Sequence, residues 1–242
     1  MTHTLHLVGG GPGSMLALRK HFHSALAGID KPRPLVAYVG TASGDNHGFF
    51  TMIRGALALT DVRLKLARLA SPRAAASEAR SLLEECDLVF VSGGDVDLGV
   101  TLLHERDAAT TLVRLAAAGK PMIGISAGSL MLAREWVRFP DDEEDRAEIF
   151  PCLGVAPVHV DAHSEEDGWS ELRVLVRLLH ARGDVDPVGY GLTRKGCLRL
   201  TLDGAGRMEP LGTPIPRIVV RRGKIVEGKP LEKPEPVSTR RP

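Results

Sequence analysis

Short apolar runs alternate with longer amphipathic segments through the first half of the chain. Such runs predict strands, and the segments between them predict helices. The predicted strands cover residues 4–8, 35–39, 62–66, 87–91 and 122–125. The predicted helices cover residues 15–27, 49–59, 74–86, 98–105, 108–118 and 129–137. Near-continuous apolar strands that alternate with helices are typical of an α/β fold, a doubly wound and mostly parallel sheet flanked by helices.

The pattern changes after about residue 139. An acidic loop covers residues 140–148, and a helix is predicted for residues 170–180. Short strand runs follow at residues 196–202, 218–220 and 224–226, and we expect them to add antiparallel strands to the main sheet near the C-terminus. A Pro- and charge-rich end predicts a flexible tail over residues 229–242. We therefore expect a single α/β domain over residues 1–228.

Composition narrows the classes of function. The 242 residues are 43% hydrophobic and 25% charged, as in soluble globular proteins. A net charge of +1 and an aromatic content of 4% argue against a nucleic-acid partner. The three cysteines are too widely spaced for a disulfide framework or a C-x-x-C site; they are Cys86, Cys152 and Cys197. Because no signal peptide or membrane-length apolar run is visible, we expect a cytoplasmic protein with no membrane partner.

The most informative motif is a G-x-S-x-G pattern formed by Gly124, Ser126 and Gly128. An apolar, strand-like run precedes it and a helix-compatible segment follows it. This is the context of a nucleophile elbow, in which a serine occupies a sharp strand-to-helix turn. The Ser126 hydroxyl would then project from the carboxyl edge of the sheet. The amide of Ala127, at a helix N-terminus, would be free to donate to a developing oxyanion.

Other predicted strands also end in glycine-rich loops. Ligands of open α/β sheets lie beyond the carboxyl ends of the strands. The loop at residues 9–13 lacks G-x-G-x-x-G, so a tight turn is favoured over a dinucleotide site. The Gly93-Gly94 pair lets backbone amides approach a ligand closely, and a second oxyanion donor has to come from such a loop. Asp95, which follows the pair, is a candidate substrate-binding residue.

The segment from His159 to His163 contains two histidines and Asp161 in an H-x-D-x-H pattern. Alternate residues of a strand share one face, so the three side chains could ligate a metal. No further His or Cys cluster completes that site. As the alternative, His163 at the end of a strand could reach Ser126 and act as its catalytic base.

Order and spacing of these motifs resemble the dipeptidase E and cyanophycinase family of serine peptidases, whose fold is related to that of class I glutamine amidotransferases. The matching elements are the Gly9-Gly10-Gly11 opening, Gly93-Gly94-Asp95, Ser126-Ala127-Gly128, His163 at 37 residues after the serine, and Gly189-Tyr190-Gly191-Leu192. The resemblance implies that Ser126 is the nucleophile, that His163 is the base, and that the amides of Gly94 and Ala127 form the oxyanion hole. Glutaminase chemistry is disfavoured, because Ser126 stands where amidotransferases carry cysteine.

The sequence departs from the family at the triad acid. Family members usually place this carboxylate just after the strand that matches residues 189–192, and here that position holds Arg194. A base without an acid loses the group that orients it and stabilises its charged form. Asp141 is our first substitute, since a dipeptidase E-like protein also carries an aspartate 15 residues after the serine. Asp161 and Asp186 are further candidates.

A second departure concerns the substrate. Aspartyl dipeptidases and cyanophycinases carry basic residues after the histidine, whereas residues 164–171 here include Glu165, Glu166, Asp167 and Glu171. Acidic charge beside the base would repel an aspartyl side chain. We therefore expect peptides with N-terminal Asp to be poor substrates.

The leading hypothesis is a serine hydrolase that cleaves short peptides or isopeptides through an acyl-enzyme, with no metal or organic cofactor. A non-catalytic relative that binds peptides or metabolites and has lost the triad acid is the competing hypothesis. A metal-dependent hydrolase that uses His159, Asp161 and His163 is the third. A homodimer is compatible with the sequence.

Overall fold

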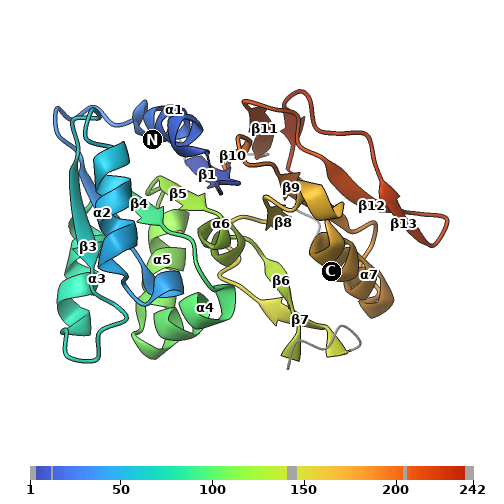
Figure 1. Ribbon diagram of the computed structural model, residues 1–242, viewed down its shortest axis with the longest axis horizontal. Helices are drawn as coiled ribbons and strands as arrows, with labels where there is room; N and C mark the ends of the chain where they lie inside the picture. Colours follow the sequence, from blue (N-terminus) through green and yellow to red (C-terminus); the bar gives the residue numbers. More distant parts are fainter. Residues whose placement is uncertain (1–3, 12, 141–145, 204–205, 238–242) are drawn as a thin grey trace.

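A central sheet of eight strands organises the computed structural model, which describes residues 4–11, 13–140, 146–203 and 206–237 (Figure 1). Its strands are β1 (Thr4–Val8), β2 (Leu35–Val39), β3 (Arg63–Ala67), β4 (Leu88–Val91), β5 (Met122–Ile125), β10 (Cys197–Thr201), β11 (Arg207–Leu211) and β14 (Glu235–Pro236). Their order is β14-β11-β10-β1-β5-β4-β2-β3. The first five strands of the chain pair in parallel, and β10, β11 and β14 add antiparallel neighbours. The predicted fold class, a mostly parallel α/β sheet with antiparallel C-terminal strands, is confirmed.

Helices cover both faces of this sheet, because its strands are apolar on both sides. One face packs against α1 (Met15–Leu26) and α2 (His47–Ala56). The other packs against α3 (Ala76–Glu85), α4 (Val96–Glu105), α5 (Ala108–Ala117) and α6 (Ala127–Leu132). Two short 3₁₀ helices lie in loops, η1 (Thr41–Ser43) and η4 (Glu165–Asp167). None of the helices that the structure describes combines the length and apolar character needed to cross a bilayer.

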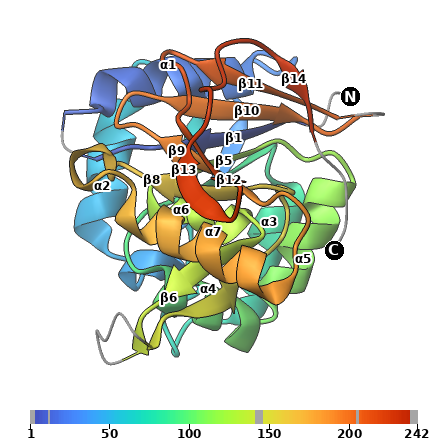
Figure 2. The same ribbon diagram turned by 90° about the vertical axis from the view of Figure 1, so that its right-hand side faces the viewer.

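A second, four-stranded sheet stands beside the first, in the order β13-β12-β9-β8. Its strands are β8 (His159–Ala162), β9 (Val188–Leu192), β12 (Arg217–Arg221) and β13 (Lys224–Glu227). Helix α7 (Ser170–Arg182) packs on this sheet and lies below β12 and β13 in Figure 2. The helix approaches β9 closely, since a Cβ at Gly189 would lie 2.6 Å from Leu172 Cδ1. The C-terminal strands are therefore divided between two sheets, whereas the sequence predicted that all of them join the main sheet.

The helix predicted for residues 129–137 is wrong in its second half. Helix α6 ends at Leu132, Ala133 is extended, and Glu135–Arg138 forms strand β6. This strand pairs with β7 (Glu148–Pro151) in an antiparallel hairpin. Val137 is fully buried in the cluster that includes α7, so tertiary packing overrides the local helical pattern here.

The predicted flexible tail also needs correction. Residues 229–237 have defined partners: Leu231 forms a β-bridge with Ile215, and β14 pairs with β11. Leu231 and Val237 are buried in the main core. The apolar residues among the prolines and charges hold this segment against the domain. Residues 238–242 lie outside the described part of the chain.

Candidate active site

Ser126 occupies the sharp turn between β5 and α6, at the carboxyl edge of the central sheet. Its backbone has φ 54° and ψ −128°, a left-handed conformation that is strained for a residue with a side chain. The turn is held from both sides: the Ser126 amide donates to Val8 O at 2.9 Å, and the Ser129 amide donates to Ser126 O at 2.8 Å. Such strain, retained by surrounding contacts, is typical of a functional turn.

The two flanking glycines are required by close backbone packing. A Cβ on Gly124 would lie 2.5 Å from Gly128 O, and a Cβ on Gly128 would lie 2.2 Å from Val91 O. Neither space can hold a side chain. The G-x-S-x-G pattern therefore has a physical basis in this fold, and it fixes where the serine projects.

His163 follows strand β8 and faces Ser126. The Ser126 hydroxyl lies 2.8 Å from His163 Nε2, a normal hydrogen-bond distance. His163 has φ 49°, so its side chain leaves the alternation of the strand, and its amide donates to Leu192 O at 2.8 Å. The structure thus brings together the two residues that the sequence proposed as nucleophile and base, 37 positions apart.

The predicted oxyanion donors lie on the two loops that meet at Ser126. Ala127 is the first residue of α6, so its amide has no acceptor within the helix. Gly94 has φ 143°, and a Cβ there would lie 2.0 Å from Ala42 O. The preceding residue lies against the serine itself, because a Cβ on Gly93 would lie 3.0 Å from Ser126 Cβ. The Gly93-Gly94 loop is therefore packed directly against the serine.

Asp95, predicted as a substrate-binding residue, has a structural contact instead. Its Oδ1 accepts the amide of Leu98 at 2.9 Å and caps α4. Its own amide donates to Ala42 O at 2.7 Å. The first bond caps α4 and the second ties the Gly94 loop to η1, and the role of Asp95 toward a substrate stays a prediction.

No carboxylate in the described part of the chain is hydrogen-bonded to His163. Asp141, our first candidate for the triad acid, lies outside the described residues. Asp161 Oδ1 accepts the amide of Ala162 at 2.7 Å, while its Oδ2 is buried without a partner in the described residues. Asp186 lines a separate cavity together with His159 and Arg182. The orienting acid therefore remains unassigned.

Arg194 stands at the position that resembles the family's acid, and it is tied to the acidic segment. Its guanidinium pairs with Glu166 at 2.9 Å, and its amide donates to Glu165 Oε1 at 3.1 Å. Asp167 accepts the amide of Trp169 at 3.0 Å, just before α7. These carboxylates are thus engaged with their own segment and with Arg194, so they are not free charges facing a substrate.

Glu171, which the sequence named only for its negative charge, also has a specific hydrogen-bond partner. It lies in the first turn of α7 and accepts a hydrogen bond from Trp136 Nε1 at 3.3 Å. Burial raises its pKa above the ordinary value, and the charge of nearby His163 opposes that rise. Glu171 therefore lies near the base, within the acidic segment that the sequence placed beside it.

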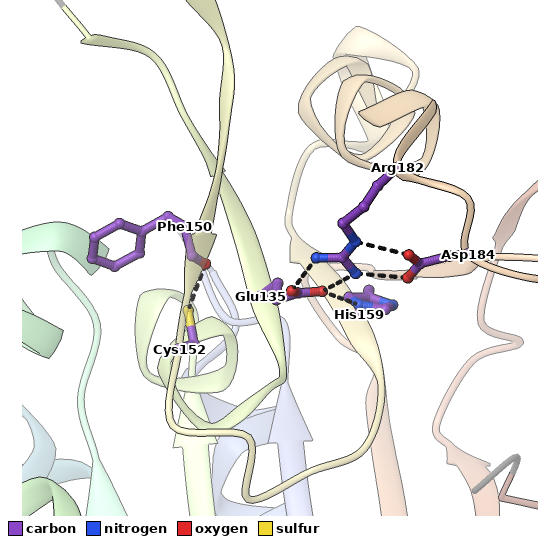
Figure 3. Close-up of polar contacts among 6 residues, drawn as sticks. All are labelled: Glu135, Phe150, Cys152, His159, Arg182 and Asp184. Carbon is purple, nitrogen blue, oxygen red and sulfur yellow. Dashed lines mark hydrogen bonds and ion pairs between the residues drawn. The ribbon is translucent and has the colours of Figure 1, made fainter. Parts of the chain in front are cut away.

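The histidine pair does not converge on a metal site. His159 Nε2 donates to Glu135 Oε2 at 3.0 Å, and Arg182 bridges Glu135 and Asp184 (Figure 3). His163 is engaged with Ser126 instead. Within the described ranges, no group of three or more His, Cys, Asp or Glu side chains is arranged to hold a metal ion. The described residues therefore add nothing to the H-x-D-x-H pattern that would favour the metal hypothesis.

The cysteines offer no competing nucleophile. All three are free thiols, and Cys86 and Cys197 are buried. Burial raises the pKa of Cys152 to about 12, and its Sγ lies 3.9 Å from Phe150 O (Figure 3). A thiol with such a pKa is not a thiolate at neutral pH.

A serine on a strained strand-to-helix turn, with a histidine in hydrogen-bond reach, gives this α/β protein the geometry of enzymes that use a serine nucleophile. The chain belongs to peptidase family S51, whose sequence model matches residues 5–201. Family membership supports a peptidase, a kind of hydrolase, as the class of this protein.

Relatives agree with this assignment. Peptidase E of Streptomyces coelicolor (strain ATCC BAA-471 / A3(2) / M145) is 27% identical over 128 residues, which are 53% of this chain. The match spans about half (50%) of that curated relative's length. A crystal structure of a peptidase from an acI-B1 Actinobacterium has a TM-score of 0.70 at 18% identity, covering 96% of this chain and 97% of that one. A protein provisionally named peptidase E from Listeria monocytogenes EGD-e has a TM-score of 0.58 at 14% identity, covering 95% and 99%. At these identities the two structures show the fold alone.

Proposed function

We propose that this protein is a serine peptidase that cleaves short peptides or isopeptides through an acyl-enzyme. One observation carries the proposal: the Ser126 hydroxyl lies 2.8 Å from His163 Nε2 on a strained strand-to-helix turn. A serine hydroxyl is a weak nucleophile until a neighbouring base accepts its proton. The histidine is in place to do so without rearrangement.

The chemistry follows from these groups. Ser126 Oγ forms a bond to the substrate carbonyl carbon while its proton passes to His163 Nε2. The amides of Gly94 and Ala127 donate to the negative oxygen of the tetrahedral intermediate. His163 then gives the proton to the leaving amine as the C–N bond breaks, which leaves an ester on Ser126. Water repeats the sequence, with His163 again as base, and releases the acid product.

The position of Arg194 supports a second candidate function. Since the acid of the family pattern is replaced, and no described carboxylate is bonded to His163, the chain would be a non-catalytic relative that binds peptides in the same site. Loss of the acid in a catalytic triad lowers kcat by about 10⁴-fold, which leaves a slow enzyme. The two candidates therefore differ in turnover and share a binding site.

The test is hydrolysis of a panel of short blocked and unblocked peptides, followed by mass spectrometry. We expect wild-type protein to form products and Ser126→Ala to lower the rate by about 10⁴-fold or more. His163→Ala should lower it to a similar extent, because the two residues act as a unit. Ser81→Ala, on the exposed surface of α3, is the matched control and should leave the rate unchanged. Folded wild-type protein that binds peptides in calorimetry without any product would favour the non-catalytic candidate.

A further inference from the structure

A cavity of about 340 Å³ opens directly beside Ser126. Ser126, Gly93 and Gly94 form the side of the cavity that carries the reacting groups. The opposite walls come from two helices: Met15 begins α1, and Phe49 and Met52 belong to α2. The volume is near the lower end of the range for small-ligand pockets, about 300–1,000 Å³. It therefore suits one side chain rather than a large ligand.

The wall of this cavity is mostly apolar and carries no charged side chain among the described residues, although the hydroxyls of Tyr38, Ser14 and Ser92 contribute to it. Among the described residues that line it, none is Asp, Glu, Lys, Arg or His. Tyr38 contributes a rigid part of the lining, since its ring stacks on Phe90 at 5.5 Å and meets Phe50 edge-on at 5.2 Å. Burial raises the pKa of Tyr38, so its hydroxyl is neutral. None of the described lining residues is a cation that could pair with an acidic side chain, and Arg194, which lies beside Gly11, is already paired with Glu166.

The position of His163 decides which part of a peptide enters the cavity. The histidine must give its proton to the leaving amine, so the leaving group lies on its side of the serine. His163 does not line the cavity, and neither do residues of the acidic segment 164–171. The cavity thus lies toward the acyl half of the substrate, beside the two glycines. The group that fits there is the side chain attached to the carbonyl under attack.

We propose that this cavity selects substrates with an apolar side chain, such as Leu, Met or Phe, on the residue whose carbonyl Ser126 attacks. The inference rests on the proposed function, because it uses Ser126 as the nucleophile. An aspartyl side chain in this cavity would lose its water without gaining a cationic partner among the described lining residues, which is costly for an ionised group. The discrimination against Asp therefore arises from the apolar wall of α1 and α2, and not from the acidic segment after His163.

Covalent inhibitors separate this inference from the proposed function. An alkyl fluorophosphonate, which carries no amino-acid side chain, reports whether Ser126 reacts at all. Diphenyl aminoalkylphosphonates that carry the Leu, Ala or Asp side chain report what the cavity accepts, independently of the leaving peptide. We expect the Leu analogue to modify Ser126 at least about tenfold faster than the Ala analogue, because each methylene in an apolar pocket contributes about tenfold or more. The Asp analogue should react about a hundredfold more slowly than the Leu analogue, or not at all.

A positive charge placed on the wall should weaken the preference for Leu over Asp. Met52→Arg is suited to this, since Met52 lines the cavity and is 50% exposed, so its replacement does not disturb the core. We expect the Leu-to-Asp ratio of reaction rates to fall by at least about tenfold. Leu59→Arg is the matched control, because Leu59 is an exposed apolar residue that does not line the cavity. Its ratio should equal that of the wild type.

Each outcome has one meaning. If the fluorophosphonate modifies Ser126 but the Asp analogue reacts as fast as the Leu analogue, the cavity inference is wrong and the proposed function stands. The same holds if Met52→Arg and Leu59→Arg change the ratio equally. If folded wild-type protein reacts with none of the probes, the proposed function is wrong and the cavity inference is overturned with it.

Discussion

Replacing Asp161 by Asn tests whether this buried carboxyl group, beside the candidate site, is protonated in the folded protein. Asp161 is 4% exposed, and one of its oxygens has no partner in the described residues. Burial, together with the negative charge of Glu171, raises the pKa of Asp161 from 3.8 to about 7. The folded protein therefore holds a proton on Asp161 through a pH range in which the unfolded chain has released it.

The sign of the effect follows from proton binding. Between pH 4 and 7 the folded state binds more protons than the unfolded state, so the free energy of unfolding falls as pH rises. The fall is about 1.4 kcal/mol per pH unit over roughly three units, or about 4 kcal/mol in total. Asn carries no charge at any of these pH values. We expect Asp161→Asn to unfold like the wild type near pH 4 and to be more stable by up to about 4 kcal/mol at pH 8.

Urea unfolding followed by circular dichroism at pH 4, 5, 6, 7 and 8 measures this difference. Activity at pH 6 is the second readout. A triad acid must be ionised to stabilise the histidinium, and its conversion to an amide lowers kcat by about 10⁴-fold. Since Asp161 is protonated at that pH and bonds the amide of Ala162, we expect the variant to keep its rate within a few-fold. A stability difference that does not change with pH would refute the buried-acid argument, and a collapse in rate would make Asp161 the orienting acid.

Three further predictions concern other parts of the molecule. Gly94→Ala should lower kcat by about 10²-fold or more, because the Cβ of the new alanine would meet Ala42 O and displace an oxyanion donor. Helix content, measured by circular dichroism, should change little. An unchanged rate would show that Gly94 is not an oxyanion donor. Glu135→Gln should lower the free energy of unfolding at pH 7 by about 2 kcal/mol, measured in urea. The hydrogen bond from His159 lowers the pKa of Glu135 to about 2, so this stabilisation is complete above about pH 4.5 and the difference should vanish as pH falls toward 2. Hydrolysis should survive a chelator, because His159 is held by Glu135; activity that is lost to the chelator and restored by Zn²⁺ would support the metal hypothesis.

Local patterns account for the parts of the fold that the sequence predicted well. Strands β2 and β4 are apolar at every position and buried on both faces, so their runs are unambiguous. Strand β6 was missed because residues 135–138 continue a helix-compatible segment. Its extended form depends on the hairpin with β7 and on the burial of Val137 against α7. Similarly, nothing local in the Pro-rich end indicates that Leu231 bridges Ile215.

Local patterns likewise predicted some parts of the candidate site and not others. Ser126 was predictable because the two glycines and the strand before it act within one turn, and His163 was assigned as the base through the resemblance to a family with a histidine at this spacing. The hydrogen bond between Trp136 and Glu171 and the apolar cavity were not predictable. Met15 and Met52 come from separate helices that only the folded sheet brings to the serine, and no short motif marks either residue.

The central claim is that Ser126 is a nucleophile activated by His163, and intact-mass analysis after exposure to an alkyl fluorophosphonate tests it most directly. We predict a single adduct on wild-type protein, mapped by proteolysis to Ser126. We predict no adduct on Ser126→Ala and much slower modification of His163→Ala, because the histidine accepts the serine proton. A folded wild-type protein that stays unmodified, or that is modified as fast without His163, would contradict the account.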